Sequence, residues 1–89
     1  MTGMLAFSLA GHDAKKIYII IEETDEYVFL CDGVIKTIDR PKKKRKKHIQ
    51  IVKKEIDASL QDRIRKKEKY TNEEIKRAIK LFRAEITAE

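Results

Sequence analysis

The chain has no tryptophan, one cysteine, one proline and three glycines among its 89 residues. So little glycine and proline excludes collagen-like, silk-like and Pro/Gly-rich disordered proteins. The single cysteine, Cys31, cannot form an intramolecular disulfide, so nothing requires an oxidising compartment. Long apolar runs are also missing, because no run is longer than the five residues of Ile17–Ile21. Five residues cannot cross a bilayer or form the core of a signal peptide, so we expect a soluble, cytoplasmic protein.

Charge, in contrast, is abundant and unevenly distributed. Charged residues make up 40% of the chain, and the net charge is +6. Residues 1–39 carry three bases and seven acids, whereas residues 40–54 carry nine bases and no acid. The centre of this block, Arg40–Lys47, predicts a self-repelling, extended and mobile loop unless a polyanion neutralises it. Such a block is typical of a nucleic-acid contact, and the alternative is a solvated loop without a ligand.

The first half of the chain predicts five short β-strands. Apolar, β-branched and aromatic residues gather in short runs separated by turn signals, among them Asp32-Gly33 and the polar break at residues 24–26. We expect strands at residues 4–9, 17–23, 27–31, 34–38 and 48–52. Pro41 cannot donate to a ladder, so the fourth strand should end before it. Five strands at this spacing favour a small β-barrel over a sheet with crossover helices.

The second half predicts two helices. Ile56, Leu60 and Ile64 recur at intervals of four residues, which indicates a first helix. Thr71-Asn72-Glu73-Glu74 has the pattern of a capping box, in which the Thr71 hydroxyl accepts the Glu74 N–H and the Glu74 side chain reaches back. A second helix should follow, with an apolar stripe at helical spacing formed by Ile75, Ala78, Ile79, Phe82 and Ile86. We expect this stripe to be a packing face.

The sequence offers little for catalysis, metal binding or nucleotide binding. No CxxC or HxxxH spacing occurs, so a structural zinc site is not expected, and no GxGxxG or P-loop indicates a nucleotide site. His12-Asp13 pairs a base with a carboxylate, but no nucleophile is signalled nearby. Cys31 alternates with Phe29 in an apolar run, which favours a small strand residue over a reactive thiol. We therefore expect no enzyme activity, no metal and no cofactor.

The order of several short motifs resembles the bacterial KOW-domain RNA-binding proteins, which look like relatives of archaeal and eukaryotic large-subunit ribosomal proteins with an SH3-like barrel. The resemblance covers residues 3–50 in order, and the helix start at residues 71–75 also fits the family's tail. The motifs that carry it are Gly3 before an apolar strand, Ser8-Leu9-Ala10-Gly11-His12-Asp13, Asp25-Glu26-Tyr27-Val28, Asp32-Gly33, and Arg40-Pro41-Lys42-Lys43-Lys44 through His48-Ile49-Gln50. The resemblance implies an SH3-like barrel and RNA binding, with ribosomal or structured RNA as partner.

The turn after the first strand departs from that family pattern. The family reads Gly-Arg-Asp-Lys-Gly there, and Gly11 and Asp13 match it. His12 stands in place of Arg, Ala14 in place of Lys, and Lys15 in place of the second glycine. If that glycine position needs a positive φ, Lys15 must adopt an unfavourable backbone conformation.

These observations predict a non-catalytic RNA-binding module. Its fold would be a five-stranded SH3-like barrel over residues 1–52 with a basic loop at 40–48, followed by a helical extension over residues 53–89 that packs on the barrel. Cations of the basic block and of nearby loops would neutralise phosphates without reading sequence. The candidate RNA-binding residues are Arg40, Lys42, Lys43, Lys44, Arg45, Lys46, Lys47, His48, Lys15, Lys16, Lys36 and His12.

The main alternative is a protein-interaction adaptor. Small SH3-like barrels can bind peptides, and the acidic first part of the chain could meet a basic partner while the basic block meets an acidic one. A second alternative concerns Pro41–Lys46, which matches a short nuclear-import signal. That match is weak, because any dense basic run satisfies it and this run lies inside the expected domain.

Overall fold

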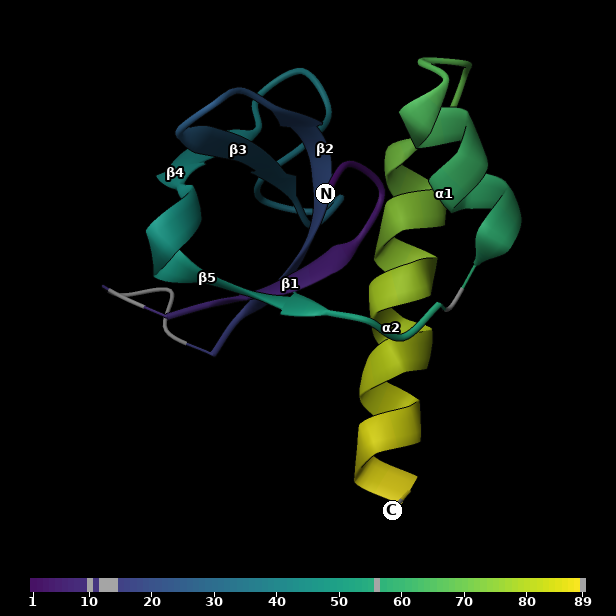
Figure 1. Ribbon diagram of the computed structural model, residues 1–89. Helices are drawn as coiled ribbons and strands as arrows, with labels where there is room; N and C mark the ends of the chain where they lie inside the picture. The colour runs from purple at the N-terminus through teal and green to yellow at the C-terminus, as the bar shows by residue number, and fades with distance from the viewer. Residues whose placement is uncertain (10, 12–14, 56, 89) are drawn as a thin grey trace.

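The described part of the chain forms an antiparallel sheet followed by two α-helices (Figure 1). The computed structural model describes residues 1–9, 11, 15–55 and 57–88. In chain order the elements are β1 (Leu5–Ser8), β2 (Ile17–Glu23), β3 (Tyr27–Cys31), β4 (Lys42–Arg45), the 3-10 helix η2 (Lys46–His48), β5 (Ile49–Val52), α1 (Ala58–Arg65) and α2 (Asn72–Ala88). The α+β class and the five-stranded sheet are as the sequence predicts.

The predicted fourth strand, residues 34–38, is wrong. The first residues of this segment form a local turn around the Asp32 side chain. Asp32 Oδ1 accepts hydrogen bonds from the backbone N–H groups of Val34, Ile35 and Lys36, at 2.9, 3.0 and 2.9 Å respectively. Farther on, the Ile38 N–H donates to Asn72 Oδ1 at 2.9 Å. N–H groups engaged in this way cannot join a ladder, because a local side-chain acceptor competes with the neighbouring strand.

The fourth strand is instead the basic segment itself, so the prediction of a loop over residues 40–48 is also wrong. β4 pairs antiparallel with β3, with Tyr27 opposite Arg45 and Phe29 opposite Lys43. The next three residues form η2. Dense like charge predicted a mobile loop, but several of these cations find partners within the fold, as described below.

The sheet must be strongly curled. Its strand order is β4-β3-β2-β1-β5, so β4 and β5 are its two edges. In a flat sheet the two edges would lie about 19 Å apart, at about 4.8 Å per strand. Yet only η2 joins them, and a 3-10 helix rises about 2 Å per residue. A register shift between Ile20 and Glu22 in the β2–β3 pairing adds local twist. Among the described strands, no ladder joins β4 to β5.

Both faces of β2 are buried at residues 17–20, which explains the continuous apolar run there. Tyr18 and Ile20 face the inner cluster, together with Val28, Leu30 and Ile49. Alternate residues face the helices instead, because side chains along a strand alternate between faces. This second cluster consists of Leu5, Ile17, Ile19, Cys31, Leu60, Ile64, Ile75, Ala78, Ile79 and Phe82. Figure 1 shows α1 and α2 packed together on one side of the sheet.

The predicted capping box at the start of α2 is confirmed. Glu74 N–H donates to Thr71 Oγ1 at 3.2 Å, and Thr71 N–H donates to Glu74 Oε1 at 3.2 Å. The Arg63 guanidinium also donates to the Glu74 carboxylate, which joins α1 to α2. This guanidinium lowers the pKa of Glu74. One glutamate therefore both starts the second helix and ties it to the first.

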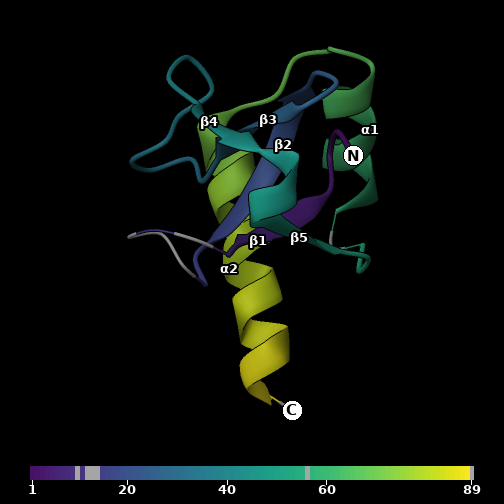
Figure 2. The same cartoon turned by 60° about the vertical axis from the view of Figure 1, so that its left-hand side comes forward.

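The apolar stripe of α2 is a packing face, as predicted, except at its end. Ile75, Ala78, Ile79 and Phe82 are buried. Ile86 is 45% exposed, because the last turns of α2 project beyond the sheet (Figures 1 and 2). Ile56, which the sequence assigned to the first helix, lies outside the described residues.

Candidate nucleic-acid interface

The bases of β4 and η2 alternate between two environments. Lys43, Arg45 and Lys47 are exposed, whereas Lys42, Lys44 and Lys46 are partly buried. Within β4, Lys42–Arg45, this alternation follows from the extended backbone, in which successive side chains point to opposite faces. Lys46 and Lys47 belong to η2, where Lys46 is partly buried and Lys47 is exposed. We call the exposed trio, Lys43, Arg45 and Lys47, the basic edge.

Two of the partly buried bases stabilise the sheet. Lys44 Nζ donates to Ser8 Oγ at 2.6 Å, and Ser8 is only 1% exposed. Lys46 Nζ lies 2.9 Å from Glu23 Oε2, and the Lys46 N–H donates to the Glu26 carbonyl at 2.9 Å. These contacts connect the basic segment to β1 and to the turn between β2 and β3. Lys44 and Lys46 are therefore less available to a ligand than the basic edge.

An aromatic ring organises part of the basic edge. Lys43 Nζ lies 4.2 Å and Arg45 Cζ 5.3 Å from the centroid of the Tyr27 ring. Both distances are within the range of a cation–π attraction. Because Tyr27 pairs with Arg45 in the ladder, the register itself brings the ring and the two cations to one face. The edge thus presents ordered charges and a partly exposed aromatic ring.

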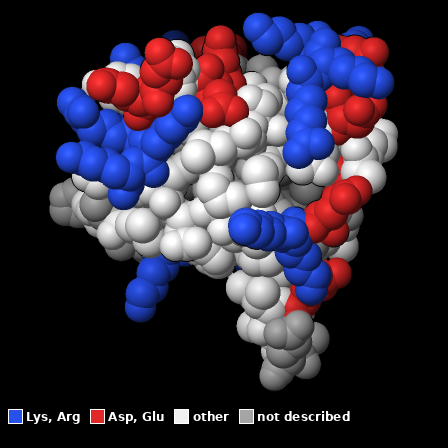
Figure 3. Space-filling model, viewed as in Figure 1, with Lys and Arg blue, Asp and Glu red and all other residues white. Residues whose placement is uncertain are grey.

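Acidic residues border the basic edge at one side. Figure 3 shows Lys and Arg side chains gathered over the region of β4 and η2, with acidic side chains beside them. One of the acids is Glu23. The N-terminal ammonium of Met1, 2.7 Å from its Oε1, and then Lys46 lower its pKa from 4.5 to about 2. On this face, acidic residues therefore border the basic edge.

The remaining predicted contact residues lie in several places. Arg40 is exposed, shortly before β4. His48 is partly buried at the end of η2, and its carbonyl accepts the Leu9 N–H at 2.9 Å. Lys16 and the partly buried Lys36 belong to the side of the molecule where the 32–36 turn meets α2. The structure does not bring Lys16 into the basic edge.

Lys15 adopts the backbone conformation expected of the missing glycine. Its φ is +70°, and its N–H donates to the Ser8 carbonyl at 2.8 Å. A lysine in this region carries a steric cost that glycine avoids. His12, the other departure in this turn, lies outside the described residues.

Cys31 has the environment of a core residue. Its side chain is fully buried, and burial raises the pKa of its thiol from 9.0 to about 11. A thiol with a raised pKa is a poor nucleophile, because the thiolate is the reactive form. Within the described residues, no three His, Cys, Asp or Glu side chains gather in a group that could hold a metal ion.

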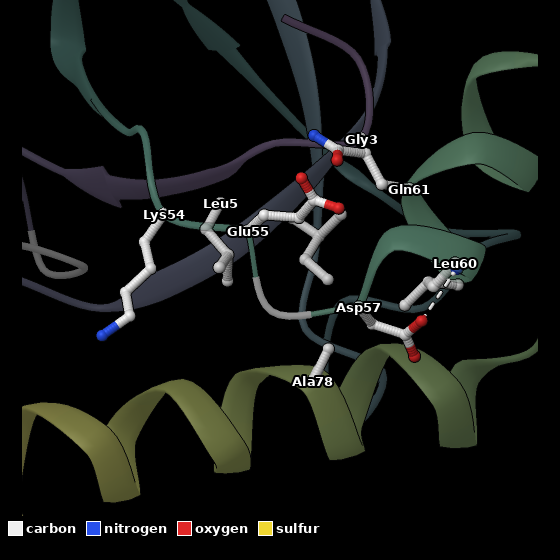
Figure 4. Close-up of a pocket in the computed structure, with 9 residues that line it drawn as sticks. Gly3, Leu5, Lys54, Glu55, Asp57, Leu60, Gln61 and Ala78 are labelled. Atoms are coloured by element: carbon white, nitrogen blue, oxygen red, sulfur yellow. Dashed lines mark hydrogen bonds between the residues drawn. The ribbon is translucent and has the colours of Figure 1, made fainter.

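The cavity drawn in Figure 4 is too small for an organic ligand. It measures about 20 Å³ and lies between Gly3, Leu5, Leu60, Gln61 and Ala78. That volume accommodates about one water molecule. Beside it, the Asp57 carboxylate accepts the Leu60 N–H at 3.0 Å and so caps α1. This region is structural.

The sequence predicted all three cations of the basic edge as contact residues but not how they are arranged. The roles of Ser8 and Glu23 as partners of Lys44 and Lys46 were not anticipated. A signal for the strand was present: residues 42–45 follow Pro41, and the motif resemblance runs on into His48-Ile49-Gln50. The sequence of six consecutive bases, residues 42–47, does not reveal which side chains face the inside of the sheet, because no apolar residue marks the inner face of this segment.

The comparisons with known proteins add no family. No family model matches the chain, and no curated protein matches it. Among the described residues, no helix has both the length and the apolar character needed to cross a membrane.

Proposed function

We propose that the protein is a non-catalytic RNA-binding module that holds phosphates on the basic edge. One observation carries this proposal: the basic segment is ordered as the edge strand β4 and the following η2, with Lys43 and Arg45 of the strand and Lys47 of η2 exposed. Preordered cations lose less conformational entropy on binding than those of a mobile loop. Contacts of this kind neutralise phosphates and give affinity that does not depend on sequence.

The proposal extends to the fold type and the kind of RNA. The strand order, the curled sheet and the short η2 between the two edge strands support an SH3-like barrel of the KOW type. With the motif order over residues 3–50, this arrangement favours structured RNA, including ribosomal RNA, as the partner. Tyr27 offers a ring on which an unpaired base could stack beside the phosphate contacts.

The test compares two triple variants that remove the same charge. In the first, Lys43→Gln, Arg45→Gln and Lys47→Gln empty the basic edge. In the second, Lys53→Gln, Lys69→Gln and Arg77→Gln remove exposed cations elsewhere. A phosphate contact contributes about 1 kcal/mol, so the first variant should bind a structured RNA hairpin up to roughly a hundredfold more weakly. The second should stay within a few fold of wild type.

Fluorescence anisotropy measures the affinities, and circular dichroism shows whether each variant is folded. Equal losses in the two triple variants would mean that total charge, not the basic edge, decides binding. A folded basic-edge variant with wild-type affinity would remove the edge from the mechanism. If wild-type protein purifies without bound nucleic acid and has no measurable affinity for RNA, the adaptor alternative is favoured.

A further inference from the structure

The turn that replaces the expected fourth strand displays two aliphatic side chains to solvent. Val34 is 60% exposed and Ile35 is 74% exposed. Such exposure of β-branched residues is not a result of disorder here. The Asp32 carboxylate accepts three N–H groups of the turn, and the Asp32 and Gly33 N–H groups both donate to the Lys36 carbonyl, at 2.8 and 3.1 Å. The fold therefore holds these two side chains outward.

The turn is also seated tightly on α2. Gly33 has φ +80°, and a Cβ at this position would lie 2.3 Å from the Asn72 carbonyl oxygen. The Ile38 N–H donates to Asn72 Oδ1 at 2.9 Å. Figure 2 shows the β3–β4 connection projecting from the sheet on the side away from α1. The turn and α2 therefore form two fixed walls.

A groove of about 420 Å³ lies between these walls, and we call it the α2 groove. Its lining combines the Val34 and Ile35 side chains with four cations, Lys16, Lys76, Lys80 and Arg83. The three cations of α2 are spaced at i, i+4 and i+7, so they share one helical face. None of the four makes an ion pair with another described residue. Asp32, the acid among the described lining residues, already accepts three N–H groups.

We propose that the α2 groove docks an acidic segment of a partner protein, with an aliphatic side chain on Val34 and Ile35 and carboxylates facing the cations. The positive charge of the groove favours an anionic ligand. The exposed Val34 and Ile35 side chains, which we call the apolar ridge, favour those anions that also carry an aliphatic group. A peptide can present a carboxylate and an aliphatic side chain a few ångströms apart, whereas an RNA backbone has no aliphatic side chain to cover Val34 and Ile35. Among the described residues that line the groove, none has an aromatic ring for base stacking.

The α2 groove is separate from the basic edge in composition, so it serves a second ligand and does not depend on RNA binding. Lys16 directly precedes β2, and the other three cations of the groove lie on α2, so none of the four belongs to β4 or η2. The opposite flank of α2 is already occupied, since Glu85 pairs with Lys54 at 2.7 Å. The other flank carries Lys76, Lys80 and Arg83, which make no ion pair within the described part of the chain.

The experiment titrates the isotope-labelled full chain with two synthetic peptides and follows backbone amide shifts. The first peptide alternates Glu with Leu, and the second, of equal length and charge, alternates Glu with Ser. The Glu/Leu peptide should bind at least about tenfold more tightly, because burying leucine on the ridge contributes affinity that serine cannot supply. Shifts should concentrate in residues 33–36 and 76–83.

Three variants assign the contacts. Ile35→Ser should remove the preference for leucine, and Lys80→Glu should weaken both peptides by about tenfold. Lys53→Glu makes the same charge change outside the groove and should leave both affinities near wild type. Because Ile35 and Lys80 are exposed, the variants should keep the wild-type melting temperature, which is measured alongside.

The basic-edge triple variant separates this proposal from the previous one. It should lose RNA affinity and retain peptide affinity, and Lys80→Glu should do the reverse. Equal binding of the two peptides, no binding of either, or shifts outside the groove would overturn the proposal. So would a loss of RNA affinity in Lys80→Glu as large as that in the basic-edge variant, which would place the groove within the RNA interface.

Discussion

Neighbouring lysines of β4 have different structural roles although they are chemically identical. Lys44 is turned toward the inner side of the sheet and donates to buried Ser8, whereas Lys43 lies on the outer face over the Tyr27 ring. A one-residue shift in register would exchange these roles, because the side-chain period of a strand is two. The register therefore decides which lysines are available to a ligand, and composition alone does not.

Glu23 links the chain terminus to the basic segment, and its titration should be visible in stability. Its pKa is lowered from 4.5 to about 2 in the folded protein, first by the Met1 ammonium and then by Lys46. A lowered folded-state pKa stabilises the fold above the unfolded-state value, and this contribution is lost as the pH falls. Wild type should therefore exceed Glu23→Gln in unfolding free energy at neutral pH, and the difference should shrink between pH 4.5 and about 2.

Urea unfolding at a series of pH values measures this difference. Glu26→Gln is the matched control, because it changes an exposed glutamate near the same turn. Its difference from wild type should not follow the same pH course. A constant gap between wild type and Glu23→Gln throughout that range would show that the ion pairs do not stabilise the fold.

Among the secondary-structure elements, the pattern of apolar residues predicted those with a buried apolar face, and local hydrogen bonds overrode that pattern once. β2, β3 and α2 were predicted because their apolar spacing matches their burial. Residues 34–38 have the composition of a strand, but the Asp32 carboxylate competes for their N–H groups. β4 was not predicted because all four of its residues are charged, so no alternation of apolar and polar residues marks it as a strand. The candidate site was thus predicted in residue type but not in geometry.

The helical packing face gives a test at the same scale. Phe82 is 3% exposed, and its ring lies 6.0 Å from that of Phe7 at an angle of 58°. Phe82→Asp would bury an unpaired charge and remove a large ring, so it should lower the unfolding free energy by about 3–5 kcal/mol. Ile86→Asp, four residues on along the same stripe, should cost about 0.5 kcal/mol or less because Ile86 is exposed.

Thermal and urea unfolding of the two variants provide the comparison. Similar stabilities for Phe82→Asp and Ile86→Asp would contradict the assignment of Phe82 to the core. A wild-type-like Phe82→Asp would further mean that α2 does not pack on the sheet, and the walls of the α2 groove would then be lost as well.

On the scale of the whole molecule, two groups of exposed cations lie on different elements. The sheet's basic edge carries three exposed cations, and α2 carries another set on its open flank. Acids such as Glu23 border the basic edge instead of spreading evenly. Bounded patches of one sign steer oppositely charged partners and limit how many contacts each patch can make. The number of contacts is what salt dependence measures.

RNA affinity should fall with salt by an amount set by the exposed cations, not by the whole basic run. Lys43, Arg45, Lys47 and Arg40 are the exposed members of residues 40–47. Each phosphate contact contributes about 0.7 to 0.9 to the slope of log K against log salt, so four contacts give a slope of roughly −3 to −4. Participation of all seven bases would give roughly −5 to −6.

The triple variant Lys43→Gln, Arg45→Gln, Lys47→Gln should reduce the magnitude of this slope by about 2 to 3, while the Lys53, Lys69 and Arg77 control should leave the slope unchanged. Anisotropy titrations at several salt concentrations give the slopes. A slope near that of seven contacts would mean that Lys44 and Lys46 leave Ser8 and Glu23 on binding, and a flat dependence would exclude phosphate neutralisation as the mechanism.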